Sequence, residues 1–297
     1  MNRDDPSTDH RLTIDQALFA ARRLLGQSGI ETAALDARIL LQWATGLTAE
    51  QLVMRGGEEL PDDAGKRFEE AIAARRRGMP VSRWMGRREF WGMDLALGPE
   101  TLDPRPDTET LVAAVLARLG RTFRPFIRDM GTGTGAILLA LLKELPQARG
   151  LGSDLSFGAL KQARLNAHAL GLSGRAGFLL SDWGAVPARR ADVLVSNPPY
   201  IARGELAGLA ADVRHHDPRR ALDGGADGLV PYRILADQLG GLVHPGGLIA
   251  LEIGYRQGKD VLSILRQAGA DVTGCGLGLV CDLAGRPRVV VARAPRR

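Results

Sequence analysis

The stretch Asp129-Met130-Gly131-Thr132-Gly133-Thr134-Gly135 decides the fold of this 297-residue chain. It follows Pro125–Met130, a run typical of a buried strand, and precedes Ala136–Leu145, which has the pattern of an apolar helix. Glycines at alternate positions permit a tight turn and a close approach of the backbone to a ligand. The spacing is not the Gly-x-Gly-x-x-Gly of dinucleotide binders, and no Lys-Ser/Thr pair follows as in a P-loop. The turn therefore favours a ligand that carries no pyrophosphate.

Strands and helices alternate on either side of this turn. Because strands that alternate with helices pair in parallel through right-handed crossovers, residues 108–297 predict an α/β, Rossmann-like domain with a seven-stranded sheet. The last two strands are joined by a loop too short for a crossover helix, so we expect them to pair antiparallel. The predicted strands are Pro125–Met130, Arg149–Asp154, Ala176–Leu180, Val193–Ser196, Leu248–Ile253, Asp271–Gly276 and Arg288–Ala292, and the predicted helices are Thr110–Leu119, Ala136–Leu145, Phe157–Leu170 and Pro231–Leu242.

Residues 1–80 predict a small helical bundle that precedes the α/β domain. Thr13 with Gln16, and Thr48 with Gln51, have the spacing of capping boxes. Asp62 or Asp63 is expected to cap a later helix that runs to about Arg77. Residues 81–107 form a linker in our division of the chain, with a hairpin or extended segment at 88–97.

Composition and charge exclude several classes of protein. Hydrophobic content of 45% and charged content of 25% are ordinary for a globular protein, and the longest apolar runs are far shorter than the roughly 20 residues of a membrane span. Met1–His10 lacks the pattern of a secretion signal, so we expect a cytoplasmic location and no contact with a membrane. Cys275 and Cys281 make neither a disulfide framework nor a metal-ligand spacing, so we expect strand or loop residues and no metal.

The net charge of +5 would suit a phosphate-bearing partner, but the excess arginine is spread along the chain. The tightest basic run, Arg75–Arg77, is expected to be a solvated helix end, with RNA contact as the alternative. We expect a monomer without direct binding to nucleic acid.

Two further predicted strand ends carry residues suited to a nucleoside. Asp154 ends the strand after the glycine turn, where a carboxylate can accept hydrogen bonds from ribose hydroxyls. Asp182 and Trp183 close the next strand, where a polar side chain and an aromatic ring can hold adenine. Alone, Asp154 could cap the following helix, and Trp183 could be a core residue. Together with the turn, they favour S-adenosylmethionine as the cofactor over NAD.

The next strand ends directly in Asn197-Pro198-Pro199-Tyr200. The prolines stop the strand and leave carbonyl groups without ladder partners. The Asn197 side-chain oxygen and the Pro198 carbonyl can accept the two hydrogens of one NH₂ group, and Tyr200 offers a flat face to a planar amide or base. An activated methyl group needs positioning more than a strong base, so no general base is assigned. This tetrad predicts methylation of a nitrogen, with Asn197, Pro198 and Tyr200 as the catalytic residues; the alternative is a proline-rich turn.

Further segments resemble one family over nearly the whole chain. The segments Glu89-Phe90-Trp91-Gly92, Pro104-Arg105-Pro106-Asp107-Thr108-Glu109, Asp212-Val213-Arg214, Ala221–Gly225 and Asp227-Gly228-Leu229 are similar to the HemK/PrmC glutamine methyltransferases of peptide chain release factors. The resemblance implies that Gly131 to Gly135, Asp154, Trp183 and Asn197 contact the cofactor. It also implies that Asn197 to Tyr200 hold the glutamine of a Gly-Gly-Gln loop in the release factor, which the helical domain recognises.

The sequence departs from this family pattern at Asp103, where an aliphatic residue is usual, and at Met130, where leucine is common. Asp107 or Thr108 could cap the helix that follows them, and the segment Pro104 to Glu109 could equally lie near the cofactor; the two roles are compatible. Alternatives to the release-factor reaction are methylation of a ribosomal protein L3 glutamine or of adenine in nucleic acid. An adenine enzyme would be expected to carry an additional nucleic-acid-binding segment. A binding module without catalysis is the third possibility.

Overall fold

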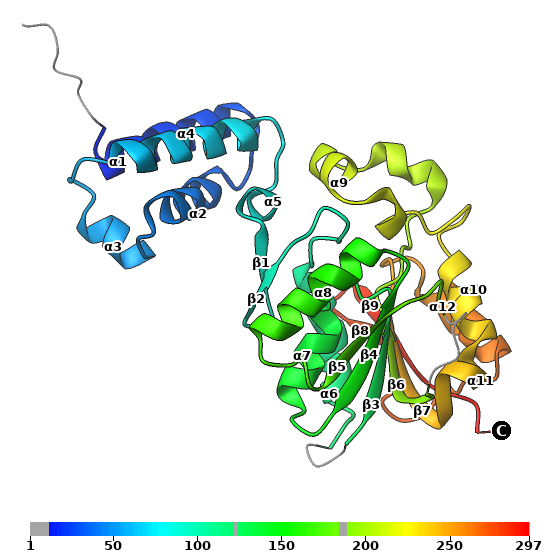
Figure 1. Cartoon of the computed structure of the whole chain (residues 1–297). Coiled ribbons are helices and arrows are strands. Elements are labelled where there is room, and N and C mark those ends of the chain that lie inside the picture. The colour runs from blue at the N-terminus through cyan, green and yellow to red at the C-terminus, as the bar shows by residue number, and fades with distance from the viewer. Residues whose placement is uncertain (1–11, 121–123, 184–188, 297) are drawn as a thin grey trace, which may run out of the picture. The chain divides into compact units, whose positions relative to one another are not determined.

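The computed structural model describes residues 12–120, 124–183 and 189–296, and it divides the chain into two compact units between Met85 and Gly86 (Figure 1). The polar segment Met1–His10, from which we predicted the absence of a secretion signal, lies outside the described residues. The division of the chain after residues 80 and 107 stays a prediction.

The first unit is a bundle of short helices, as expected. Its core is made of aliphatic side chains from α1, α2 and α4 around Phe68. The capping boxes at Thr13 and Thr48 are both formed, because each hydroxyl accepts a backbone N–H while the glutamine three residues on accepts in return. The helices are α1 (Ile14–Gln27), α2 (Ala33–Thr45), α3 (Ala49–Met54), α4 (Asp62–Arg76) and α5 (Val81–Met85).

One local expectation for α4 is wrong, and the other holds for two of its three residues. Asp62 and Asp63 do not cap it, because Pro61 occupies the N-cap position and the two carboxylates lie in the first turn, where the helix dipole favours them. The run Arg75–Arg77 ends α4, and Arg76 and Arg77 are exposed, as expected, whereas Arg75 is not solvated. Its Nε donates to Asp36 Oδ2 at 2.7 Å, and both side chains are largely buried.

The second unit begins with the predicted hairpin. Strands β1 (Arg87–Phe90) and β2 (Met93–Ala96) pair antiparallel, and the short 3₁₀ helix η1 (Pro106–Thr108) leads into α6 (Glu109–Leu116). Neither Asp107 nor Thr108 caps α6 through its side chain. Thr108 already has helical dihedral angles (φ −65°, ψ −21°), so its hydroxyl does not face the free N–H groups and is available for another partner.

Within the described residues the second unit holds a seven-stranded sheet of order β5-β4-β3-β6-β7-β9-β8 (Figure 1). All neighbours are parallel except β7–β9 and β8–β9, which confirms the predicted α/β fold and the antiparallel final pair. The strands are β3 (Phe126–Met130), β4 (Arg149–Asp154), β5 (Ala176–Leu180), β6 (Ala191–Ser196), β7 (Val243–Glu252), β8 (Gly278–Cys281) and β9 (Pro287–Arg293).

The predicted strand Asp271–Gly276 is wrong. Only Asp271 forms a bridge there, because its carboxylate accepts the backbone N–H groups of Thr273 and Gly274 and closes a turn. The strand itself is β8, which follows this turn. Cys281 lies in β8 and Cys275 in the loop before it, and both are exposed. Helix α12 (Gly258–Gln267) was not predicted.

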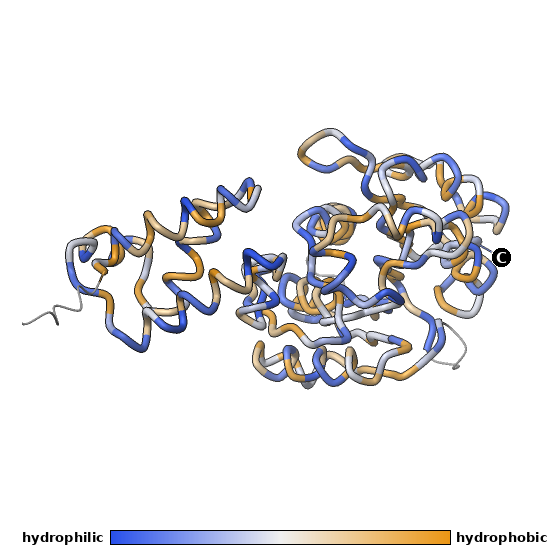
Figure 2. Tube along the Cα trace, turned by 90° about the horizontal axis from the view of Figure 1, so that it is seen from above, coloured by the Kyte–Doolittle hydropathy of each residue, from blue (hydrophilic) through white to orange (hydrophobic). Residues whose placement is uncertain are grey.

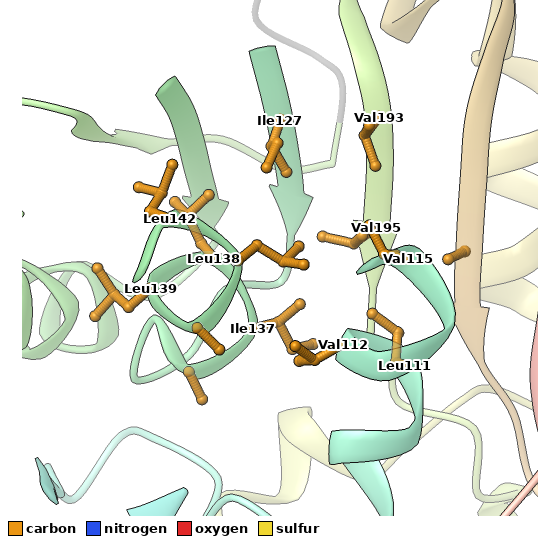
Figure 3. Close-up of a cluster of buried hydrophobic side chains, with 14 of the residues drawn as sticks. Leu111, Val112, Val115, Ile127, Ile137, Leu138, Leu139, Leu142, Val193 and Val195 are labelled. Atoms are coloured by element: carbon orange, nitrogen blue, oxygen red, sulfur yellow. The ribbon is translucent and has the colours of Figure 1, made fainter. Parts of the chain in front are cut away.

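The sheet is buried on both faces. Because successive side chains of a strand point to opposite faces, neighbouring residues of one strand belong to different cores. On β6, Val193 and Val195 face one core while Leu194 faces the other. The first core is closed by α6 and α7, whose aliphatic side chains meet those of β3 and β6 in Figure 3. The helices of this unit not yet given are α7 (Ala136–Glu144), α8 (Phe157–Ala169), α9 (Ala211–His216), α10 (Val230–Asp237) and α11 (Leu239–Leu242), with 3₁₀ helices η2 (Arg203–Gly208) and η3 (Arg219–Ala221).

No described helix has the length and apolar character needed to span a membrane. Hydrophobic and hydrophilic stretches alternate along the trace in both units (Figure 2). This alternation matches helices and strands that each bury one part of their surface in a core.

Candidate active site

The glycine turn between β3 and α7 wraps around the end of β4. Gly131, Gly133 and Gly135 have φ angles of +74°, +55° and +82°, which side-chain-bearing residues rarely adopt. The backbone N–H groups of Gly131 and Thr132 both donate to the Ser153 carbonyl, at 2.8 and 2.9 Å. The spacing of the glycines is therefore required by the shape of the turn itself.

Asp154, at the end of β4, is held by backbone N–H groups from both sides. Gly133 donates to its Oδ2 and Ser156 to its Oδ1, each at 2.9 Å. Burial raises the pKa of Asp154, and these two hydrogen bonds oppose the rise. The alternative role of Asp154 as the cap of α8 is wrong, since Ser156 is the N-cap residue and accepts from Ala159 N–H.

A second carboxylate below the turn was not predicted from sequence. Thr132 Oγ1 donates to Asp129 Oδ2 at 2.6 Å, and burial raises the pKa of Asp129 to about 7. A side chain at Gly152 would come within 2.7 Å of the Thr132 hydroxyl. The sequence could have indicated this carboxylate, because Asp129 lies at the end of β3, directly before the glycines.

A cavity of about 350 Å³ opens at the carboxyl ends of the parallel strands. It lies where open α/β sheets generally bind their ligands. Gly135, Pro198 and Tyr200 lie outside the cavity lining. The residues predicted for the site that line it are Gly131, Thr132, Gly133, Thr134, Asp154, Asp182, Trp183, Asn197 and Pro199.

Trp183 reaches the cavity from an unusual backbone conformation. Its φ is +50°, and the Ser181 hydroxyl donates to its carbonyl at 2.6 Å. The ring also packs against the core that contains Leu194 and Tyr232. The interpretations of Trp183 as a ligand-facing residue and as a core residue are therefore compatible.

Residues from two further segments complete the lining, and of these only Thr108 had been weighed from the sequence, as a helix cap or as part of a segment near the cofactor. Glu100 and Thr108 come from the segment between the hairpin and α6, while Arg220 and Gly224 follow the tetrad. Arg220 pairs with Glu100 at 2.6 Å, and the Ser156 hydroxyl donates to the same carboxylate. Two of these residues could have been found from the sequence, because Thr108 lies in the family-like segment Pro104–Glu109 and Gly224 in the family-like segment Ala221–Gly225.

The segment after the tetrad packs tightly on the tetrad itself. Ile201 N–H donates to Leu222 O at 3.1 Å, and Gly224 N–H donates back to Ile201 O at 2.8 Å. A Cβ at Gly224 would lie 2.8 Å from the Pro199 carbonyl oxygen and 2.9 Å from the Tyr200 Cα. Gly224 thus permits a backbone approach that holds the tetrad in place.

Beneath the tetrad lies Glu252, the last residue of β7, which is only 1% exposed. Its Oε1 is 3.5 Å from the Tyr200 hydroxyl, and the Tyr232 hydroxyl donates to its backbone carbonyl at 2.9 Å. Burial raises the pKa of Glu252 to about 7; hydrogen bonding by Thr108 and the charge of Arg288 oppose the rise, and the charge of Asp107 adds to it. Burial and the nearby Glu252 also raise the pKa of Tyr200.

Fold and site together define a class of protein. One cavity is lined by a glycine turn after β3, by a carboxylate at the end of β4, and by Asn197 and Pro199 of the Asn-Pro-Pro-Tyr tetrad after β6. The sheet is parallel except for its final antiparallel strands. This combination defines an S-adenosylmethionine-dependent methyltransferase domain.

Similarity to known proteins gives the family. The chain is 46% identical to the release factor glutamine methyltransferase of Rhodospirillum rubrum over 90% of this chain and 80% of that relative. It is 43% identical to that of Agrobacterium fabrum, over 95% and 97%. The chain belongs to the release factor glutamine methyltransferase family.

Two family models match parts of the chain, and one solved structure shares the fold of its second unit. The PrmC N-terminal domain matches residues 16–86, and the methyltransferase small domain matches residues 106–226. The catalytic domain of hMettl16 in complex with the MAT2A 3′UTR hairpin 6 has a TM-score of 0.55 at 17% identity, covering 76% of this chain and 82% of that one. At this identity the likeness concerns the fold.

Proposed function

We propose that this chain transfers the methyl group of S-adenosylmethionine to the side-chain amide nitrogen of the glutamine in the Gly-Gly-Gln loop of peptide chain release factors. The observation that carries the proposal is the placement of Asn197 and Pro199 in the wall of the strand-end cavity, next to the glycine turn. Methyl donor and acceptor nitrogen would then meet at one point.

The residues of the cavity fit the adenosyl part of the cofactor. An ionised carboxylate offers about four lone-pair sites, and Asp154 uses two for Gly133 and Ser156, which leaves acceptors for two ribose hydroxyls. Asp182 and Trp183 would hold the adenine ring, and the turn from Gly131 to Gly135 lets the backbone approach the methionine part. When bound, the sulfonium supplies an activated methyl group.

The tetrad would hold the acceptor amide. An amide nitrogen is a weak nucleophile, because its lone pair is delocalised into the carbonyl. The Asn197 side-chain oxygen and the Pro198 carbonyl would accept its two hydrogens and aim the nitrogen at the methyl carbon, with Tyr200 packing against the amide plane. Positioning of this kind contributes much of the barrier reduction in transfers between bound groups. We assign no general base.

The test is transfer of labelled methyl from S-adenosylmethionine to a purified release factor and to its Gly-Gly-Gln variant with Gln→Ala. Label on the native factor alone supports the proposal, and equal label on both contradicts it. Ribosomal protein L3 and RNA or DNA serve as competing acceptors. A chain that fails to bind the cofactor even well above millimolar concentration would be a binding module instead.

The partner and the setting follow from the same proposal. The helical unit would recognise the body of the release factor, and the chain would act as a monomer in the cytoplasm, without direct contact to nucleic acid. The excess of arginine is spread along the chain and not gathered in one segment, which supports a protein substrate over a nucleic acid. If the chain keeps its activity at a concentration at which size measurements show single chains, the proposed monomer is supported.

A further inference from the structure

Gln257 lies in the turn between β7 and α12, outside the cavity lining but in contact with the tetrad. The tetrad follows β6, and the turn of residues 254–257 follows β7. Because β6 and β7 are parallel neighbours in the sheet, the segments that follow them leave the same edge side by side. The sheet therefore brings the Gln257 side chain to the far end of the tetrad.

The Gln257 carboxamide joins three segments by hydrogen bonds. Its Nε2 donates to the Tyr200 carbonyl at 2.9 Å and to the Gly228 carbonyl at 3.2 Å. Its Oε1 accepts the backbone N–H of Gly254 at 3.0 Å. Backbone carbonyls only accept and a backbone N–H only donates, so these partners fix which end of the carboxamide faces the tetrad. The side chain thus uses its donor and its acceptor group at the same time.

Glycines on both sides leave room for this contact. Gly228 has a φ of +75°, and a Cβ there would overlap the Tyr200 carbonyl oxygen and lie 2.7 Å from Gln257 Nε2. A Cβ at Gly254 would lie 2.9 Å from Gln257 Oε1. The backbone around the carboxamide is therefore shaped to admit it, which is an observation separate from the hydrogen bonds themselves.

The tetrad is a stiff segment that responds as a unit to what holds its ends. Pro198 and Pro199 have fixed φ angles and no N–H group, so neither can donate a hydrogen bond that would hold the middle of the tetrad. One end continues from β6, and at the other end the Tyr200 carbonyl is held by Gln257. If that carbonyl is released, the Pro198 carbonyl and the Tyr200 ring should shift together.

We propose that Gln257 is a positioning residue that holds the Tyr200 end of the tetrad where the acceptor amide is aimed at the methyl group. It lies outside the cavity lining, so it acts through the backbone of the tetrad rather than on the substrate. The inference rests on the proposed function, because it concerns the same acceptor site.

The test exchanges the donor end of the carboxamide at constant shape. Gln257→Glu places a carboxylate oxygen opposite the two carbonyl oxygens, while its other oxygen can still accept from Gly254. Gln257→Met removes donor and acceptor while filling similar space, and it keeps the inference testable if Gln257→Glu does not fold. Gln267→Glu is the matched control, because it makes the same change in α12 at an exposed glutamine whose amide donates to Ser263 at 3.4 Å.

We expect Gln257→Glu and Gln257→Met each to lower kcat for the release factor by about 10- to 100-fold at about pH 8, because a shift of about 1 Å at the reacting groups is enough for such a loss. The KM for the release factor and the affinity for S-adenosylmethionine should change little, since the binding surfaces themselves are untouched. Gln267→Glu should match the native chain.

The pH profile separates positioning from a structural role. A protonated glutamic acid can donate one hydrogen bond, so Gln257→Glu should recover part of its kcat, relative to the native chain at the same pH, as the pH falls. Gln257→Met carries no such proton, and its ratio to the native kcat should stay flat. Taking the ratio removes the pH dependence that the chains share. Circular dichroism at each pH gives the folded fraction to which the rates are normalised.

Native kcat in Gln257→Met, a flat ratio in a folded Gln257→Glu, or an equal loss in Gln267→Glu would overturn the inference and leave the proposed function intact. A loss of cofactor affinity in proportion to the loss of kcat would overturn it as well, because it would show a general structural role. A native chain that does not label the glutamine would instead remove the proposed function.

Discussion

Substitution of Gly224 by alanine should displace the tetrad without touching any side chain of it. Gly224 does not have a positive φ, so alanine is compatible with its backbone conformation and the effect is purely one of space. The added methyl would lie 2.8 Å from the Pro199 carbonyl oxygen and 2.9 Å from both the Tyr200 Cα and the Gly228 Cα. All of these are backbone atoms, which cannot rotate away as the end of a side chain can.

The size of the displacement follows from these distances. Carbon atoms in contact lie about 3.5–4.0 Å apart, so Tyr200 or Gly224 must move by roughly 0.6 Å. A misplacement of about 1 Å can cost a reaction on the order of 100-fold, so we expect kcat to fall by about tenfold. Crowding of this kind also costs about 1–3 kcal/mol of the free energy of unfolding.

The assay is the initial rate of methyl transfer to the release factor, with cofactor affinity measured separately by calorimetry. Gly204→Ala is the matched control, because its added methyl meets no atom within 4 Å and its φ is not positive. We expect this control to retain the native kcat. A native kcat in Gly224→Ala, or an equal loss in Gly204→Ala, would refute the argument that Gly224 holds the tetrad by close backbone approach.

Three further outcomes are expected. Asp154→Asn should weaken S-adenosylmethionine binding by about 10- to 100-fold in calorimetry, since hydrogen bonds to a charged group contribute about 1.5–3 kcal/mol; unchanged affinity would contradict the assigned ribose contact. Burial raises the pKa of Glu252 to about 7, and its Oε1 lies 3.5 Å from the Tyr200 hydroxyl, so protonation of Glu252 should disturb the tetrad and kcat should fall as the pH drops through 7; a flat profile would contradict this link. The linked effect on stability has the opposite sign: a folded pKa above the unfolded one means that protonation favours the folded state, so this group should raise the free energy of unfolding from about pH 7 to about pH 5. Leu138→Ala, in a fully buried position, should cost about 2–5 kcal/mol in urea unfolding, and a cost below about 1 kcal/mol would show that the core around α7 repacks.

Local patterns were sufficient for most of the sheet and for part of the site. The strand β3 could be placed because it leads directly into the glycine turn, and Asp154 because it ends the next predicted strand. Parallel strands bring their carboxyl ends to one edge, so residues at successive strand ends become neighbours without further information. The strand predicted at Asp271–Gly276 failed because a side-chain turn competed with the ladder, which residue preferences do not weigh.

The sequence by itself determined the α/β class, the glycine turn and the tetrad, because each depends on residues that are adjacent in the chain. Only the tertiary structure showed that Asn197 donates a hydrogen bond to Thr108, that Glu252 lies at the Tyr200 hydroxyl, and that Gly224 packs against the backbone of the tetrad. These contacts join segments far apart in the sequence. Their roles depend on the direction of a hydrogen bond or on a few tenths of an ångström of space, and both quantities exist only once the chain has folded.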